Sequence, residues 1–234
     1  MVGKVYIIGA GPGDPELITV KGMRALESSD VILHDALVSR ALIERFEKLG
    51  KEIINVGKRG RHGVRQDEIN ELMLLHAKAG RTVARLKGGD PLIFGRCGDE
   101  IEFLRRHGIP FEIVPGVSSV NGVPASISLP LTDRALSSSL TVISGREDLS
   151  LSTILGGTIV VMMGRDRMDV VAERLVEIGV DPETPAVAVE NGTMSNQRAV
   201  AGILRNIGEK IAEAEMSGPV LVIIGRVAGR FHPP

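Results

Sequence analysis

Short apolar runs recur along the chain, and most are followed by a turn and then by a segment with amphipathic-helix spacing. The runs predict strands at 4–9, 30–34, 52–56, 82–87 and 111–114, and later at 140–144, 158–163, 186–190 and 219–225. The 3.6-residue periodicity predicts helices near 16–28, 41–49, 67–79, 98–107, 166–178 and 203–214. Repeated strand–helix units of this kind are typical of α/β folds with mostly parallel sheets.

The alternation of strands and helices is interrupted once, between a Pro-Gly turn at 115–116 and the predicted strand that starts at 140. Residues 118–128 are typical of a short helix of small side chains, and residues 130–139 are polar and without periodicity. The sequence therefore predicts an N-terminal α/β domain over 1–116, a connecting segment over 117–139, and a C-terminal α/β domain over 140–234.

Two glycine-rich turns follow predicted strands. The first, GAGPGDP at 9–15, opens like a dinucleotide-binding fingerprint, but Asp14 takes the place of its third glycine. A carboxylate there would face the pyrophosphate, which disfavours a diphosphate ligand; a helix cap is the alternative reading of Asp14. The second turn, LKGGDP at 86–91, ends the fourth predicted strand. Because ligands bind at the carboxyl ends of parallel strands, the two turns can line one crevice.

Composition excludes several classes of protein. Apolar residues make up 43% and charged residues 24%, as in globular proteins, but there are 28 glycines where an average near 7% gives about 16. The 28 basic and 29 acidic residues leave a net charge of −1, which provides no general field for a nucleic acid. There is one cysteine, no apolar run long enough for a membrane span and no signal-peptide pattern. We expect a cytoplasmic protein that binds neither nucleic acid nor membrane.

Seven motifs, in order, resemble the uroporphyrinogen-III C-methyltransferase family of S-adenosylmethionine-dependent tetrapyrrole methylases. They are GAGPGDP (9–15), HDALV (34–38), GKRG (57–60), Gln66 with Ile69 and Asn70, LKGGDP (86–91), PGVSS (115–119) and PLTDR (130–134). The resemblance runs from about residue 5 to residue 227. It implies the tetrapyrrole methylase fold, two α/β domains with the active site in the cleft between them, in a homodimer.

The resemblance also implies a reaction, the methylation of C2 and C7 of uroporphyrinogen III to precorrin-2 with S-adenosylmethionine as methyl donor. Carried over position by position, it places cofactor-binding residues at Pro12, Gly88, Gly89, Asp90, Ile93, Ser118, Ser119, Met162, Gly164, Gly192 and Val220. An acidic turn suits this cofactor, which carries a sulfonium cation and no diphosphate. The five scattered histidines and Cys97 show no metal-ligand spacing, so we expect no metal.

The expected substrate carries eight carboxylates, so its site needs cations. The segment 57–65 supplies four of them, and Lys58 and Arg59 together with Arg40, Arg96 and Arg134 are the predicted substrate-binding residues. Taken alone, a basic loop is more often a solvated surface. Asp35, which follows the second predicted strand, is the candidate catalytic carboxylate, with a loop-capping role as the alternative.

The chain departs from the family pattern at two motifs: Cys97 and Asp99 replace Gly and Glu, and Asp133 replaces His. Cys97 is most simply a small buried residue. Rival functions are a same-fold methylase acting on a later corrinoid, on the diphthamide precursor or on ribosomal RNA, and a non-catalytic tetrapyrrole- or nucleotide-binding regulator. The chain ends soon after the last predicted strand, which favours a single methyltransferase activity over a fused sirohaem synthase.

Overall fold

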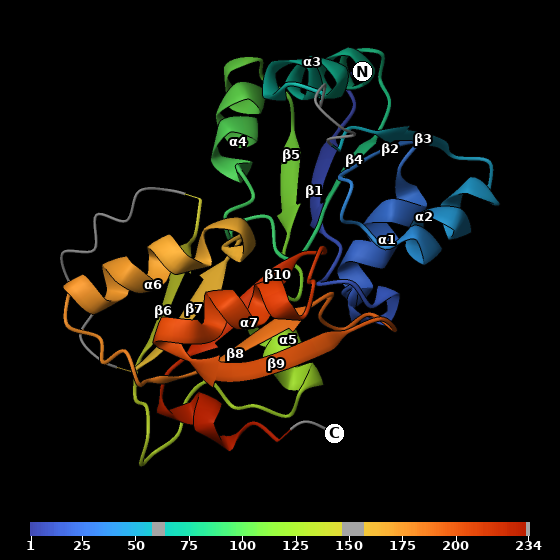
Figure 1. Ribbon diagram of the computed structural model, residues 1–234. Helices are drawn as coiled ribbons and strands as arrows, with labels where there is room; N and C mark the ends of the chain where they lie inside the picture. Colours follow the sequence, from blue (N-terminus) through green and yellow to red (C-terminus); the bar gives the residue numbers. More distant parts are fainter. Residues whose placement is uncertain (58–63, 147–156, 233–234) are drawn as a thin grey trace. The chain divides into compact units, whose positions relative to one another are not determined.

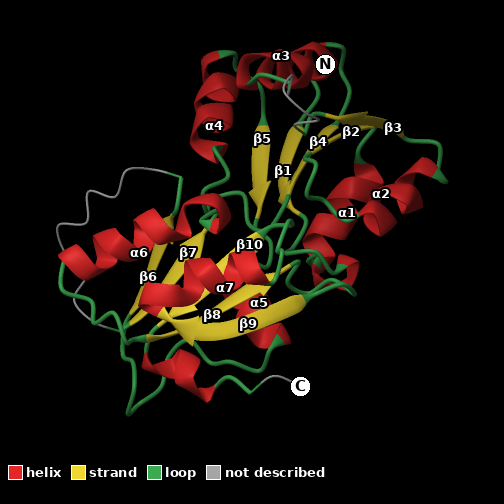
Figure 2. Ribbon diagram, in the orientation of Figure 1, coloured by secondary structure: helices red, strands yellow, loops and turns green. Residues whose placement is uncertain are grey.

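The computed structural model describes residues 1–57, 64–146 and 157–232, which form two compact units, Met1–Ser118 and Ser119–Pro234. Each unit contains a five-stranded sheet with helices packed against it (Figures 1 and 2). The predicted fold class, two α/β domains, is confirmed. The two units are described separately below.

In the first unit, strands and helices alternate along the chain. The elements are β1 (Val5–Gly9), α1 (Val20–Ser28), β2 (Val31–His34), α2 (Arg40–Glu47), β3 (Glu52–Asn55), α3 (Gln66–Lys78), β4 (Val83–Lys87), α4 (Cys97–Arg106) and β5 (Phe111–Val114). The sheet order is β3-β2-β4-β1-β5, and every pairing is parallel. All five carboxyl ends therefore lie at one edge of the sheet, where the turns that follow them can meet.

Both faces of this sheet are buried, as is usual for a parallel sheet between helices. Successive side chains of β4 alternate between the faces: Val83 packs with the core under α3 and α4, and Ala84 and Leu86 pack with the core under α1 and α2. Arg85 and Lys87 follow the alternation of Val83, and both are buried. Two cations thus lie on the α3 and α4 side of the sheet.

The predicted helix over 16–28 is interrupted. A short 3-10 turn at Pro15–Leu17 comes first, and α1 begins only at Val20, because Ile18 and Thr19 have extended backbone angles. The hydroxyl of Thr19 accepts a hydrogen bond from the Gly22 N–H at 3.0 Å and caps α1. Asp14 caps the 3-10 turn by accepting from the Glu16 N–H at 2.8 Å.

The second unit has a mixed sheet. Its elements are α5 (Ser119–Ser126), β6 (Leu140–Ser144), β7 (Thr158–Met162), α6 (Met168–Glu177), β8 (Pro185–Glu190), β9 (Arg198–Ile203), α7 (Ile207–Glu213) and β10 (Val220–Ile224). In the order β6-β7-β10-β8-β9, only β6 and β7 pair in parallel. Here the expectation of mostly parallel sheets holds for the first unit only. A short connection makes β9 antiparallel to β8, and β10, which follows α7, runs antiparallel to both of its neighbours, β7 and β8.

The structure adds one strand that the sequence pattern missed. Strand β9 forms an antiparallel hairpin with β8 at the edge of the second sheet. Its sequence, RAVAGI, contains two alanines and a glycine, residues with weak strand preference, so its periodicity is hard to see. One face of the sheet packs with Met168 and Leu175 of α6 and Ile207 of α7, and the other packs with Val123 of α5 and the C-terminal Phe231.

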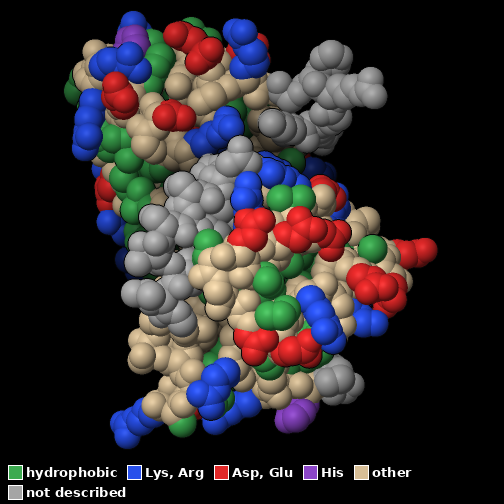
Figure 3. All heavy atoms as spheres, turned by 60° about the vertical axis from the view of Figure 1, so that its left-hand side comes forward, with side chains coloured by type: hydrophobic (Ala, Val, Ile, Leu, Met, Phe, Trp, Pro, Cys, Tyr) green, Lys and Arg blue, Asp and Glu red, His purple; other side chains and the backbone are tan. Residues whose placement is uncertain are grey.

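The surface carries charges of both signs. On the face shown in Figure 3, Lys and Arg side chains are interspersed with Asp and Glu side chains, in keeping with the net charge of −1. None of the helices in the described part of the chain is both long and apolar enough to span a bilayer.

Candidate active site

Three turns meet at the carboxyl edge of the first sheet. Gly11 and Gly89 exchange backbone hydrogen bonds, with N···O distances of 3.3 and 2.7 Å. A Cβ on Gly116 would lie 2.4 Å from the Gly89 carbonyl oxygen and 2.7 Å from the Cα of Gly9. The turns after β1, β4 and β5 therefore touch backbone to backbone, an approach that only glycine permits.

The Asp90 side chain links the turn after β4 to the turn after β5 by hydrogen bonds. One carboxylate oxygen accepts from the Leu92 N–H at 2.8 Å, and the other accepts from the Gly116 N–H at 3.0 Å. Among the predicted cofactor-binding residues, Pro12, Gly88, Gly89 and Asp90 lie in the turns after β1 and β4. Ile93, two residues after Pro91, is 40% exposed, and Ser118 is half-buried at the end of this unit.

The turns after β2 and β3 form a second group at the same edge. A Cβ on Gly57 would lie 2.1 Å from the Ala36 nitrogen, so the first residue of the basic segment 57–65 lies directly beside the residue after Asp35. A Cβ on Gly88 would lie 3.5 Å from the Cβ of Leu37, which links this group to the turn after β4. Lys58 and Arg59 lie outside the described residues.

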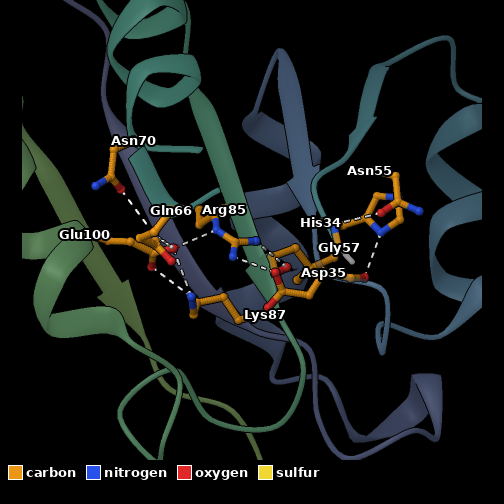
Figure 4. Close-up of polar contacts among 10 residues, drawn as sticks. His34, Asp35, Asn55, Gly57, Gln66, Asn70, Arg85, Lys87 and Glu100 are labelled. Carbon is orange, nitrogen blue, oxygen red and sulfur yellow. Dashed lines mark hydrogen bonds and ion pairs between the residues drawn. The ribbon is translucent and has the colours of Figure 1, made fainter. Parts of the chain in front are cut away.

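Four charged side chains form a cluster beneath this edge, which we call the Arg85 cluster: Asp35, Arg85, Lys87 and Glu100 (Figure 4). Arg85 donates from Nη2 to Asp35 Oδ1 at 2.5 Å and from Nε to Glu100 Oε1 at 2.9 Å. Lys87 Nζ lies 2.9 Å from both Glu100 oxygens. The cluster holds two cations and two anions, so its charges balance.

Helix positions explain how Glu100 reaches the cluster. Cys97, Glu100 and Leu104 are the buried positions of α4, which places the Glu100 carboxylate on the face that packs against the sheet. Gln66, at the start of α3, donates to Glu100 Oε1 at 3.3 Å and to Asn70 at 3.2 Å. Each buried charge therefore has a hydrogen-bonded partner, which is the condition for burying a charge without a large free-energy cost.

Asp35 is the member of the cluster that reaches solvent. Its side chain is 31% exposed, whereas the side chains of Arg85 and Glu100 are 2% and 0% exposed. The Asp35 backbone is also fixed: its N–H donates to the Leu86 carbonyl at 3.1 Å, and its carbonyl accepts from the Val38 N–H at 3.3 Å. The structure thus holds a partly exposed carboxylate at the point where the turns after β2, β3 and β4 converge.

His34 supports the Asp35 backbone. Its Nδ1 lies 3.0 Å from the Asp35 carbonyl oxygen, and because a carbonyl only accepts, Nδ1 carries the proton. Burial lowers the pKa of His34, which favours the neutral imidazole. The ring is therefore a neutral donor that orients the turn.

In the second unit, predicted cofactor-binding residues lie at the ends of neighbouring strands. Met162 ends β7, Gly164 follows it, and a Cβ on Gly145 would lie 2.4 Å from the Gly164 Cα. Gly192 follows β8, and a Cβ there would lie 2.5 Å from Val123. Val220 begins β10 and is buried in the core, and Ser119 begins α5.

Glu190, which the sequence analysis did not single out, anchors this region. It is buried at the end of β8; Oε1 accepts from the N–H groups of Ser217 and Gly218, both at 2.6 Å, and Oε2 pairs with Arg198. Burial by itself would raise the pKa of Glu190, but the hydrogen bonds from Gly218, Arg198 and Ser217 outweigh it and lower the pKa. An ionised Glu190 therefore fixes the turn that leads into β10.

Left-handed backbone conformations concentrate around the predicted site residues. Seven non-glycine residues in the described part have a positive φ: four are adjacent to predicted cofactor-binding positions, and a fifth, Arg96, is a predicted substrate-binding residue. Those five are Phe94 and Arg96 after β4, Met163 after β7, and Asn191 and Thr193 after β8. Such conformations cost about 1–3 kcal/mol each and are typical of functional sites.

The described cationic residues of the predicted substrate site lie on different elements. The Arg40 guanidinium pairs with Glu44 at 2.9 Å and Glu47 at 3.2 Å on its own helix and is exposed. Arg96 is exposed at the start of α4 in the first unit, and Arg134 is exposed in the second. Next to Arg134, Asp133 caps its own turn, accepts from Ala135 at 2.9 Å and pairs with Arg230 at 2.6 Å.

Cys97, the first residue of α4, is buried. Burial first, and then the nearby Glu100 carboxylate, raise the pKa of its thiol to about 11, so the thiol stays protonated and unreactive at neutral pH. Within residues 1–57, 64–146 and 157–232, no group of three or more His, Cys, Asp or Glu side chains is placed to hold a metal ion.

One feature of the sequence indicates the Arg85 cluster. Arg85 and Lys87 lie within the predicted strand at 82–87, and a charged residue in a strand needs a partner if the strand is buried. Nothing in the sequence identifies Glu100 as that partner, because it lies 15 positions from Arg85 and Asp35 lies 50 positions away.

Comparison with known proteins supports the resemblance. The sequence model of the family described as Tetrapyrrole (Corrin/Porphyrin) Methylases matches residues 4–208. The chain is 42% identical to a uroporphyrinogen-III C-methyltransferase of Methanocaldococcus jannaschii, with 97% of each chain covered. It is 41% identical to a siroheme synthase of Pseudomonas fluorescens, of which it spans 50%.

Solved structures of the same fold agree. A uroporphyrin-III C-methyltransferase from Thermus thermophilus, in complex with S-adenyl homocysteine, is 39% identical with a TM-score of 0.83, covering 98% of this chain and 100% of that one. A cobalt precorrin-4 methyltransferase is 28% identical with a TM-score of 0.82, covering 96% of this chain and 95% of that one. The family that the seven motifs resemble is thereby confirmed.

Proposed function

Because the chain belongs to the tetrapyrrole (corrin/porphyrin) methylase family, we propose that it methylates uroporphyrinogen III, with S-adenosylmethionine as methyl donor. The finer proposal is successive methylation at C2 and C7, giving precorrin-2 and S-adenosylhomocysteine. The observation that carries the proposal is 42% identity over 97% of both chains with a relative named for this substrate.

The proposed cofactor site uses the turns at the strand ends. In the first unit it comprises Pro12, Gly88, Gly89, Asp90, Ile93 and Ser118, and in the second Ser119, Met162, Gly164, Gly192 and Val220. When bound, S-adenosylmethionine supplies an electrophilic methyl group. Since both Asp90 oxygens already accept backbone hydrogen bonds, the role we propose for Asp90 is to hold bare backbone of the Gly-Gly and Pro-Gly turns toward the cofactor.

Asp35 is the proposed catalytic carboxylate. As the pyrrole carbon of the substrate forms its bond to the methyl group, positive charge develops on the ring nitrogen, and a proton must then leave the substrate. A partly exposed carboxylate stabilises that charge and accepts that proton. Holding the substrate carbon in line with the methyl group is the other contribution of the chain, worth about 7–11 kcal/mol in well-oriented reactions.

Substrate carboxylates are proposed to bind Arg40, Lys58, Arg59, Arg96 and Arg134. The position of Gly57 beside Ala36 supports the assignment of Lys58, since the basic segment starts next to Asp35. Arg40 would have to exchange Glu44 and Glu47 for a substrate carboxylate. We also propose that the protein acts in the cytoplasm, as its composition led us to expect, and as a homodimer, as the sequence resemblance implies.

The test is incubation of the purified protein with S-adenosylmethionine and enzymatically generated uroporphyrinogen III, followed by mass spectrometry. We expect product with one and then two added methyl groups. A parallel incubation with a later corrinoid tests the alternative that the 28% identical cobalt precorrin-4 methyltransferase suggests. Methylation of the corrinoid alone would overturn the proposed substrate.

Substitution of Asp35 tests its role. We expect Asp35→Asn to lower kcat about 100-fold or more, the usual contribution of a positioned acid–base group, because the amide accepts no proton. Affinity for S-adenosylhomocysteine, measured by calorimetry, should stay within about twofold. A normal kcat would assign Asp35 to the loop-capping role instead.

A further inference from the structure

Each of the three nitrogens of the Arg85 guanidinium donates a hydrogen bond. Nε is bound to Glu100 at 2.9 Å, Nη2 to Asp35 at 2.5 Å, and Nη1 to the Leu86 carbonyl at 3.3 Å. The Leu86 carbonyl also accepts the Asp35 N–H at 3.1 Å, so one strand residue positions both members of the ion pair. A planar group held at three points has one orientation.

Glu100 is the anchor of the guanidinium. Its carboxylate is fully buried and accepts from Gln66 of α3, from Arg85 and from Lys87. Two helices and the central strand therefore meet at this one side chain (Figure 4). Lys87 also pairs with Glu100, so the negative charge of Glu100 is balanced by Lys87 and the positive charge of Arg85 is balanced by Asp35.

The two oxygens of Asp35 are not equivalent. Oδ1 is bound by Arg85, whereas Oδ2 has no hydrogen-bond partner among the described residues. The side chain is 31% exposed although its partner is buried. Because Arg85 binds Oδ1 and Oδ2 has no such partner in the described part of the chain, Oδ2 is the oxygen suited to accept a proton.

We propose that Arg85 is a positioning residue for methyl transfer, one that holds Asp35 in a single orientation from inside the protein, with Glu100 and Lys87 fixing the guanidinium in turn. This proposal rests on the proposed function and adds to it a role for residues that do not themselves reach the substrate. It also explains why a central, buried strand contains two cations.

The chemistry of the guanidinium is required for this role. Arginine has a planar fork of five N–H donors, whereas lysine has a single ammonium centre on a flexible chain. An ammonium at position 85 keeps the charge but cannot donate to Asp35, Glu100 and the Leu86 carbonyl in one fixed plane. Arg85→Lys therefore keeps the positive charge at position 85 and removes the fixed orientation that the guanidinium gives to Asp35.

A double-mutant cycle tests the proposal. The wild type, Asp35→Asn, Arg85→Met and the double variant are compared in kcat for uroporphyrinogen III methylation and in affinity for S-adenosylhomocysteine. Because Arg85 acts through Asp35, we expect Arg85→Met to lower kcat at least about tenfold in the wild type and by less than about twofold in the Asp35→Asn background. Cofactor affinity should change little in all four.

A merely structural Arg85 would give a different result. Its loss would then lower kcat by the same factor whether residue 35 is Asp or Asn, and this outcome would overturn the proposal. Wild-type kcat in Arg85→Lys would overturn it as well. If the wild type itself transfers no methyl group to uroporphyrinogen III, the proposed function fails, a result distinct from an additive cycle.

Two further variants distinguish the loss of a positioning role from the loss of the folded structure. If Arg85→Met does not give the wild-type circular dichroism spectrum, Arg85→Gln replaces it in the cycle, because it removes the guanidinium but keeps a polar side chain beside Glu100, which stays paired with Lys87. Glu112→Gln is the control, since it breaks ion pairs on β5, at the edge of the same sheet. We expect its kcat to stay within about twofold of the wild type, whereas a loss as large as that of Arg85→Met would attribute the effect to the stability of the sheet and overturn the proposal.

Discussion

At the scale of single residues, ionised side chains in this protein differ in what surrounds them. Glu100 is fully buried and held by three donors, whereas Glu112 lies at the surface between two lysines. Lys4 Nζ is 2.6 Å and Lys21 Nζ is 2.5 Å from the Glu112 carboxylate. Hydrogen bonds from Lys21 and Lys4 lower the pKa of Glu112 to about 2.

Glu112 should make stability depend on acid pH. A folded-state pKa of about 2, below the ordinary value of 4.5, means that the stabilisation is present above pH 4.5 and is lost as pH falls toward 2. We expect Glu112→Gln to lower Tm at pH 7, and the difference from wild type to shrink between pH 4.5 and 2. Thermal unfolding followed by circular dichroism across this range measures it.

Glu102→Gln is the matched control for that prediction, since the nearest nitrogen of Arg106 is 3.9 Å from Glu102 and both side chains are exposed. Its effect on Tm should be small at every pH. A Glu112→Gln difference that persists unchanged at pH 2 would show that packing, and not charge, accounts for the loss.

At the scale of elements, the turns after β1, β4 and β5 need glycine because their backbones lie in contact with one another. Gly116→Ala would place a methyl group 2.4 Å from the Gly89 carbonyl oxygen, and neither backbone can move without disturbing the other turns. We expect the free energy of unfolding to fall by about 1–3 kcal/mol and affinity for S-adenosylhomocysteine to fall with it. Urea unfolding and calorimetry measure the two effects.

Gly98→Ala is the control for the glycine argument. Gly98 lies in the first turn of α4, and a Cβ there meets no atom within 4 Å. Alanine should leave stability unchanged or raise it by up to about 1 kcal/mol, because it favours the helix. Equal losses in both variants would mean that the tight contact at Gly116 has no special energetic role.

The sequence predicts elements better than it predicts their contacts. Strand β4 and its glycine turn are visible because apolar alternation and glycine are local signals. Strand β9 is missed because alanine and glycine weaken that signal, and the break at Ile18 depends on a cap by Thr19 that competes with a continuous helix. Asp35 could be chosen from its place after a strand, but its link to Arg85 and Glu100 exists only in three dimensions.

At the scale of the whole molecule, each compact unit has cores of its own. The clusters beneath α1, α2, α3 and α4 lie within Met1–Ser118, and those around α5, α6 and α7 lie within Ser119–Pro234. Each unit is about the size of an ordinary independent domain. This organisation makes the two units candidates for separate folding.

Expression of the two units as separate chains tests this independence. We expect the fragment 1–118, and also the fragment 119–234, to unfold in urea in one cooperative transition with the circular dichroism of an α/β protein. A fragment that binds a hydrophobic dye and shows no transition would contradict the prediction.

The buried thiol has a practical consequence for experiments on motion. Cys97 is the single cysteine of the sequence, it is 3% exposed, and the pKa of its thiol is about 11. At neutral pH the natural protein should therefore hardly react with maleimide reagents. Cysteines introduced at exposed positions, one in each unit, can then carry a fluorescent donor and acceptor without first removing the native thiol, so that the distance between the units can be followed in solution.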